Sequence, residues 1–131
     1  MDKNIFAIMN EGQGEKVRFS TTENQIVIYN AISSKGVALS KRLDEEFKVT
    51  DIVVTSSDVH SDIRDENSEM ISIPVVHFFT TDKQHIATIS KGVCEAIEGL
   101  AVCAMLPTPE NPITVKFVKA MGAITMEVIS I

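Results

Sequence analysis

The sequence predicts a mainly β protein, a small Greek-key barrel of six or seven strands with one α-helix at about residues 90–106. Three observations lead to this fold class. Short segments rich in β-branched residues recur along the chain and are separated by turn signals. A single stretch, late in the chain, has the periodicity of an amphipathic helix. The length of 131 residues suffices for one hydrophobic core.

Three strands are expected in the first half of the chain, over residues 16–20, 25–32 and 47–55. The first alternates polar and apolar residues, and the second is rich in β-branched ones. Before them, residues 1–14 form either an N-terminal arm or a further strand. After them, the polar and acidic residues of about 56–69 are expected to form an exposed loop. We expect the whole chain, residues 1–131, to fold as a single domain.

Four more strands are expected in the second half, over residues 71–80, 85–89, 113–118 and 123–129. The first two form the clearest hairpin of the chain. Pro74 places an edge or a bulge at the start of this hairpin, because proline cannot donate a ladder hydrogen bond. Ser90 is a suitable N-cap for a helix that has Val93, Ile97 and Leu100 on one face.

The acidic charge of the chain is concentrated in one segment. With 12 Lys and Arg against 18 Asp and Glu, the formal net charge is −6, which argues against a protein that holds duplex DNA by charge alone. Nine of the acids and two of the bases lie between Asp44 and Glu69, so the rest of the chain has ten bases and nine acids and can present a locally basic face. The acidic segment is either an ordinary solvated loop or a stretch that projects away from the working face or tunes affinity for a polyanion.

The sequence contains no motif typical of catalysis or metal binding. Cys94 and Cys103 are nine residues apart on the predicted helix and cannot form a CxxC clamp, and His77 and His85, with Asp82 nearby, lack a further metal ligand. There is no glycine-rich phosphate loop and no nucleophile elbow. We therefore expect no enzyme activity, no metal and no cofactor. The cysteine content, the lack of a long apolar run and the N-terminal residues predict a soluble, cytoplasmic protein without membrane contact.

Basic residues recur beside aromatic or β-branched residues, a combination that suits a flexible single strand of nucleic acid. Rings stack on unpaired bases, and cations follow the phosphates. Residues i and i+2 share a strand face, so Lys16 and Arg18 are expected to point together. Phe78 and Phe79 must face opposite ways, so one of them is exposed or is covered by another element. The residues predicted on these grounds to contact nucleic acid are Lys16, Arg18, Tyr29, Lys35, Arg42, His77, Phe79, Lys83, His85 and Lys116.

Four short motifs, taken in their order along the chain, resemble a known family. They are Ile28-Tyr29-Asn30-Ala31, Phe79-Thr80-Thr81-Asp82, Ala87-Thr88-Ile89-Ser90-Lys91 and Thr114-Val115-Lys116-Phe117-Val118. With the chain length and the acidic pI, they resemble the small single-stranded DNA-binding proteins of protein-primed Bacillus phages, the phi29 group. The resemblance runs from about residue 26 to the C-terminus. It implies an OB-type barrel that coats and protects displaced single strands during viral DNA replication.

The chain departs from this family at the residues that stack on DNA. In the family, tyrosines in the strand before the acidic loop, within that loop and in the strand before the helix are implicated in stacking. The corresponding positions here, which are Thr55 or Ser56, residues 60–63 and Ile86, are not aromatic. Either stacking has moved to other rings, which we favour, or this relative binds weakly.

The resemblance also sharpens the list of predicted contacts. Lys91 and Lys116 match family lysines at the start of the helix and in the penultimate strand, so Lys91 joins the predicted site. The rings to which stacking is expected to have moved are those of Tyr29, Phe79, His77 and His85.

The first hypothesis is therefore a sequence-tolerant single-stranded DNA-binding protein. It is expected to work as a monomer or a weak homo-oligomer in the host cell cytoplasm, with replication proteins as further partners. The alternative is a phage-encoded protein-interaction module or an acidic DNA mimic that inhibits a host enzyme, since spaced carboxylates in residues 44–69 can imitate phosphates. A third hypothesis is a structural or metabolite-binding β domain without nucleic acid, which an apolar pocket in the barrel mouth would favour.

Overall fold

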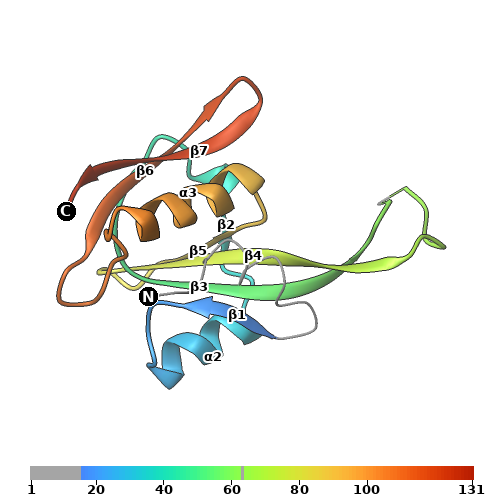
Figure 1. The fold of residues 1–131 in the computed structure, drawn as a ribbon, viewed down its shortest axis with the longest axis horizontal. Coiled ribbons are helices and arrows are strands. Elements are labelled where there is room, and N and C mark those ends of the chain that lie inside the picture. Colours follow the sequence, from blue (N-terminus) through green and yellow to red (C-terminus); the bar gives the residue numbers. More distant parts are fainter. Residues whose placement is uncertain (1–15, 63) are drawn as a thin grey trace.

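The protein, in a computed structural model that describes residues 16–62 and 64–131, is built on one curled sheet (Figure 1). Seven strands form this sheet in the order β2-β5-β4-β3-β6-β7, and β1 pairs with β3 beside this path. The strands are β1 (Val17–Ser20), β2 (Val37–Ala38), β3 (Glu46–His60), β4 (Met70–Thr80), β5 (His85–Thr88), β6 (Ile113–Ala120) and β7 (Ala123–Ser130). The mainly β fold class is confirmed, and the curled sheet fits a small OB-like barrel. The predicted N-terminal arm lies outside the described residues.

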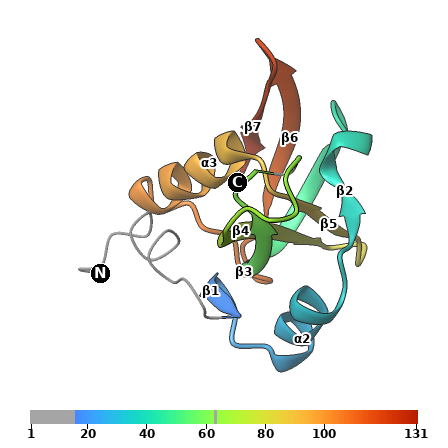
Figure 2. The same cartoon turned by 90° about the vertical axis from the view of Figure 1, so that its right-hand side faces the viewer.

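Helices lie on both sides of the sheet. The helices of the described residues are α2 (Gln25–Ser33), α3 (Lys91–Val102) and the short 3-10 helix η1 (Leu39–Lys41). Figures 1 and 2 show α3 against one face of the curled sheet and α2 below the other. The face toward α3 is the inner face, and the face toward α2 is the outer face. This division decides which side chains of each strand are available to a ligand.

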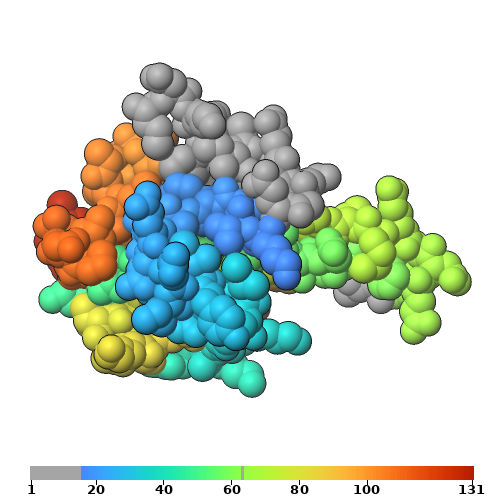
Figure 3. All heavy atoms as spheres, turned by 90° about the horizontal axis from the view of Figure 1, so that it is seen from below, coloured from blue at the N-terminus to red at the C-terminus, as the bar shows by residue number. Residues whose placement is uncertain are grey.

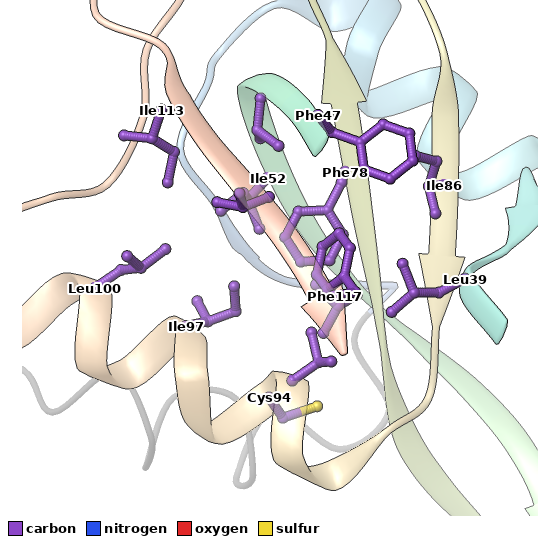
Figure 4. Close-up of a cluster of buried hydrophobic side chains, with 14 of the residues drawn as sticks. Leu39, Phe47, Ile52, Phe78, Ile86, Cys94, Ile97, Leu100, Ile113 and Phe117 are labelled. Atoms are coloured by element: carbon purple, nitrogen blue, oxygen red, sulfur yellow. The ribbon is translucent and has the colours of Figure 1, made fainter. Parts of the chain in front are cut away.

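The hydrophobic core lies between α3 and the inner face. Val93, Ile97 and Leu100 of α3 are buried, as the predicted helix face requires, and Ile52 lies with them in the same cluster (Figure 4). The rings of Phe78 and Phe117 pack with their centroids 5.0 Å apart. The helix ends at Val102, earlier than expected from the sequence. Gly92 lets α3 approach β7 closely, since a Cβ there would lie 2.4 Å from the Ile124 carbonyl oxygen.

Residues 25–32 form a helix, so the strand predicted there is wrong. Asn24 begins α2 by accepting hydrogen bonds at Oδ1 from the backbone N–H groups of Ile26 (2.9 Å) and Val27 (3.5 Å). This N-cap satisfies donors that a helix start leaves free. Within α2 only Ala31 is buried. The segment is therefore a largely exposed helix, although its β-branched residues favour a strand.

Strands β3 and β4 form a long hairpin that projects from the body as an arm. The two strands pair without interruption from Asp51 opposite Phe79 to His60 opposite Met70. Figure 1 shows the far part of this hairpin extending well beyond the rest of the sheet. Residues 56–60, which are polar except for Val59, belong to β3, so the connection covers residues 61–69 and is shorter than the sequence indicates. We refer to Asp58–Met70 as the arm tip.

Candidate nucleic-acid interface

A groove lies on the outer face of the sheet, beneath the segment that joins α2 to η1. Along β3 and β4, Val54 and Phe78 point to the core, so the alternate residues Thr55 and His77 face outward. The groove has a volume of about 1120 Å³. Its lining consists of residues 31–41 and 55–57, Val75, His77, residues 87–90 and Ile124. Figure 3 views the molecule from this side and shows α2 in blue, with the arm projecting to the right.

The groove is cationic although the chain as a whole is acidic. Among the residues that the structure describes, its lining contains Lys35 and Lys41 and no Asp or Glu. Eight lining residues are Ser or Thr, whose hydroxyl groups can donate to or accept from a ligand. Three large apolar side chains at the groove are exposed: Ile32 (43%), Val37 (44%) and Ile89 (64%). Such a surface can hold a polyanion that also carries flat, partly apolar groups.

Tyr29 supplies an exposed ring next to this groove. It lies on α2 one turn before the lining residue Ile32, and 67% of its surface is exposed. Ile26, Tyr29 and Ile32 follow one another at three-residue spacing and so share one face of the helix. Among the aromatic residues that the structure describes, Tyr29 is the one classed as exposed. The outward position that a stacking residue needs is therefore present at Tyr29.

His77 lies at the floor of the groove, and its ring is connected to the rings of His85 and Phe79. His77 is only 2% exposed, and its Nε2 lies 2.9 Å from Thr55 Oγ1. Its Nδ1 lies 2.7 Å from Nε2 of His85, whose ring stacks on Phe79 at 4.5 Å between centroids. Burial, together with the charge that His85 would carry, lowers the pKa of His77 to about 4, and burial also lowers the pKa of His85. Both imidazoles are thus neutral at pH 7. The ring of His77 is buried in the floor of the groove and is not exposed for stacking on a base.

Arg18 is a buried residue and presents no cation to solvent. It is 5% exposed, and it donates from Nε to Ser56 Oγ (2.8 Å) and from Nη2 to Ser72 Oγ (2.9 Å). Desolvation lowers the pKa of its guanidinium. Lys16, in contrast, is exposed, and its carbonyl accepts from the backbone N–H of the groove residue Ser56. The two side chains therefore have different surroundings, although the sequence predicts a shared face.

The remaining predicted contacts divide between the groove and the rest of the surface. Lys35 and His77 line the groove, whereas Lys91 is exposed and directly follows the groove residue Ser90 without lining the groove itself. Three other basic residues do not line the groove. Arg42 pairs with Glu45 through two hydrogen bonds of 2.8 and 2.9 Å, and Lys83 lies exposed in the turn between β4 and β5. Lys116 lies on β6 opposite Glu46.

Several groove residues were not among the predicted contacts. Lys41 and three exposed apolar residues line the groove as well, namely Ile32, Val37 and Ile89. The sequence held one usable signal, which is the pair Lys35 and Lys41 on either side of a short apolar stretch. The apolar residues gave no such signal, because an isoleucine is expected from the sequence to be buried in the core.

The fold and the groove together define a class of protein. In the part of the chain that the structure describes, the small OB-like sheet carries on its outer face a groove lined by lysines and by no carboxylate. This is the architecture of an oligonucleotide-binding protein. Comparison with protein-family models matches residues 15–131 to the phi29-type family of phage single-stranded DNA-binding proteins, and the chain belongs to this family. Comparisons with curated proteins and with solved structures find no significant match.

The family assignment confirms the resemblance stated from the sequence and supports the first hypothesis over the two alternatives. The family consists of DNA-binding proteins and not of enzymes. Within residues 16–62 and 64–131, no group of three or more His, Cys, Asp or Glu side chains is arranged to hold a metal ion. The helices of the described part of the chain include none that is long and apolar enough to span a membrane.

Proposed function

We propose that this chain binds single-stranded DNA in the groove on the outer face of its sheet. The observation that carries the proposal is the groove lining, whose described residues include Lys35 and Lys41 and no carboxylate, in a chain of net charge −6. In this arrangement the lysines neutralise phosphates, and Tyr29 stacks on an unpaired base beside them. The apolar residues Ile32 and Ile89 cover the faces of further bases.

The same surface accounts for binding that tolerates sequence. Every base has an aromatic face, so stacking on Tyr29 does not select among bases. The groove hydroxyls, such as those of Ser40 and Ser57, are suited to donate to phosphate oxygens, which carry no sequence information. A protein with this surface suits the coating and protection of strands displaced during viral DNA replication in the host cell cytoplasm. We expect a monomer or a weak homo-oligomer, with replication proteins as further partners.

The chain contains one tyrosine and no tryptophan, so its ultraviolet fluorescence reports on Tyr29 alone. We expect this fluorescence to be quenched when oligo-dT is added, because a base stacks on the ring. In the double variant Lys35→Ala/Lys41→Ala, affinity for oligo-dT should fall, and the slope of log K against log salt should decrease by about 1.4, since each neutralised phosphate of a single strand contributes about 0.7.

The matched control replaces two exposed lysines outside the groove, Lys83→Ala/Lys119→Ala, which removes the same charge. This control should keep the wild-type salt slope. If the Lys35/Lys41 variant keeps both the affinity and the slope while the control loses them, the DNA binds elsewhere on the surface and the proposed groove is wrong.

A further inference from the structure

The imidazoles of His77 and His85 connect the floor of the groove to its rim, by which we mean residues Lys35–Val37. His77 lines the floor, and its Nδ1 lies 2.7 Å from Nε2 of His85. His85 in turn lies directly beneath Gly36, because a Cβ at Gly36 would be 2.8 Å from both Cδ2 and the carbonyl oxygen of His85. The backbone of the rim therefore rests on the His85 side chain with no space between them.

Few other contacts of the described residues hold the rim in place. Strand β2, which continues the rim, has two residues, and it pairs with β5 only through Val37 opposite Ile86 and Ala38 opposite Ala87. Gly36 has a φ of +66°, a left-handed conformation that favours glycine. Since Lys35 precedes Gly36 directly, the height of Gly36 above the floor fixes where this lysine meets a strand in the groove.

We propose that the hydrogen-bonded pair of His77 and His85 is the positioning element that sets the width of the DNA-binding groove. Neither residue has to touch DNA in this role. His77 is anchored from β3 by Thr55, and His85 is held from β4 by the stacked ring of Phe79. Both supports come from the sheet, so the pair transmits the position of the sheet to the rim. This inference rests on the proposed function, because it concerns the same groove.

The chemistry of the pair makes it a rigid spacer at neutral pH. One of the two facing nitrogens carries a hydrogen and donates it to the lone pair of the other, while the remaining nitrogen of His77 exchanges a hydrogen bond with Thr55. One added proton leaves this arrangement intact, whereas two would set N–H groups against each other. Lys35 and Lys41 line the groove on the rim side of the pair, and Asp51 lies opposite Phe79 on β3.

The test separates the hydrogen bond from the bulk of the side chain. His85→Gln can keep a donor or acceptor near the Nε2 position, whereas His85→Leu keeps similar bulk and leaves Nδ1 of His77 buried without its partner. We expect His85→Leu to bind oligo-dT about tenfold more weakly and His85→Gln to remain within about twofold of the wild type. Hydrogen exchange at the Val37 and Ala38 amides should accelerate in His85→Leu, while exchange in β3 stays slow. The control His60→Gln alters the one histidine outside the pair.

A second variant acts from the other side of the contact. Gly36→Ala places a methyl group against the His85 ring and strains a left-handed residue, so it should lift the rim and weaken binding even if His85→Leu fails to fold. Wild-type affinity in both His85→Leu and Gly36→Ala would overturn the inference, as would equal weakening in His85→Leu and His85→Gln. If His85→Leu binds oligo-dT with wild-type affinity while Lys35→Ala/Lys41→Ala binds more weakly, this inference is wrong and the proposed function stands. If the lysine variant binds with wild-type affinity, the proposed function itself is wrong.

Discussion

Some basic residues of this chain are buried and hold the structure together, whereas others are exposed on the surface. The sequence alone predicts only part of this division. Lys16 and Arg18 are expected to share a strand face, yet Lys16 is exposed and Arg18 is 5% exposed. The pairing of β1 with β3 shifts register between Val17 and Phe19, so the irregularity falls at Arg18. Regular alternation predicts side-chain direction only where the ladder is regular. Lys35, in the loop after α2, is exposed, as is usual for loops, which run over the surface.

The buried imidazole of His77 makes stability depend on pH. Its pKa is about 4 in the folded protein and 6.5 in the unfolded chain, so between these values the unfolded state binds a proton that the folded state does not. Stability from this residue is complete above pH 6.5 and is lost as the pH falls toward 4, by on the order of 3 kcal/mol in total. His85 contributes in the same direction, since burial lowers its pKa as well.

We therefore expect the wild type to lose more free energy of unfolding than His77→Gln between pH 7.5 and 4.5 in urea denaturation. The difference in free energy of unfolding between the wild type and His77→Gln should be largest at pH 7.5 and should decrease as the pH falls. The control His60→Gln should follow the wild-type curve. A difference of constant size across this range would show that protonation of His77 does not oppose folding.

At the scale of elements, the sequence predicted hairpins well and α2 poorly. The hairpin of β4 and β5 and that of β6 and β7 appear where turn residues separate alternating strands. Residues 25–33 contain β-branched residues that favour strands, but a strand needs a neighbour to pair with, and the capping bonds of Asn24 are available locally. The arm is longer than predicted for the converse reason: Ser56 and Ser57 are polar but find partners on β4.

The N-cap of α2 can be tested by Asn24→Ala, which removes the acceptor for the Ile26 and Val27 amides. We expect a loss of about 1 kcal/mol in the free energy of unfolding, and a nearly neutral effect for Asn24→Asp, which keeps the acceptor. Binding of oligo-dT should weaken modestly in Asn24→Ala, because Tyr29 stands on this helix. The exposed loop residue Asn67, changed to alanine, is the control in chemical denaturation. Equal stability of all three variants would mean that α2 does not depend on its cap.

For the molecule as a whole, folding separates acidic charge from the groove. The sequence places nine acids between Asp44 and Glu69, and five of these lie at the arm tip. The connection at the end of the arm carries Asp62, Asp65, Glu66 and Glu69 against Arg64. Figures 1 and 3 show this end of the arm standing away from the body. A polyanion in the groove therefore meets lysines locally, while nine of the 18 acids of the chain lie along the arm or toward the other end of β3.

This separation predicts how the acidic connection influences DNA binding. The last groove residue on β3 is Ser57, and His60, at the end of the strand, lies three residues further, or about 10 Å. The Debye length is about 10 Å at 0.1 M salt and about 30 Å at 0.01 M, so the acidic residues beyond His60 repel a strand in the groove only when salt is low. Replacing Asp62, Asp65, Glu66 and Glu69 by their amides should tighten oligo-dT binding several-fold at 0.01 M salt and by less than about twofold at 0.15 M. Titrations monitored by Tyr29 fluorescence at both salt concentrations measure this difference. An equal gain at both concentrations would contradict the long-range argument and place the arm tip in direct contact with the bound strand.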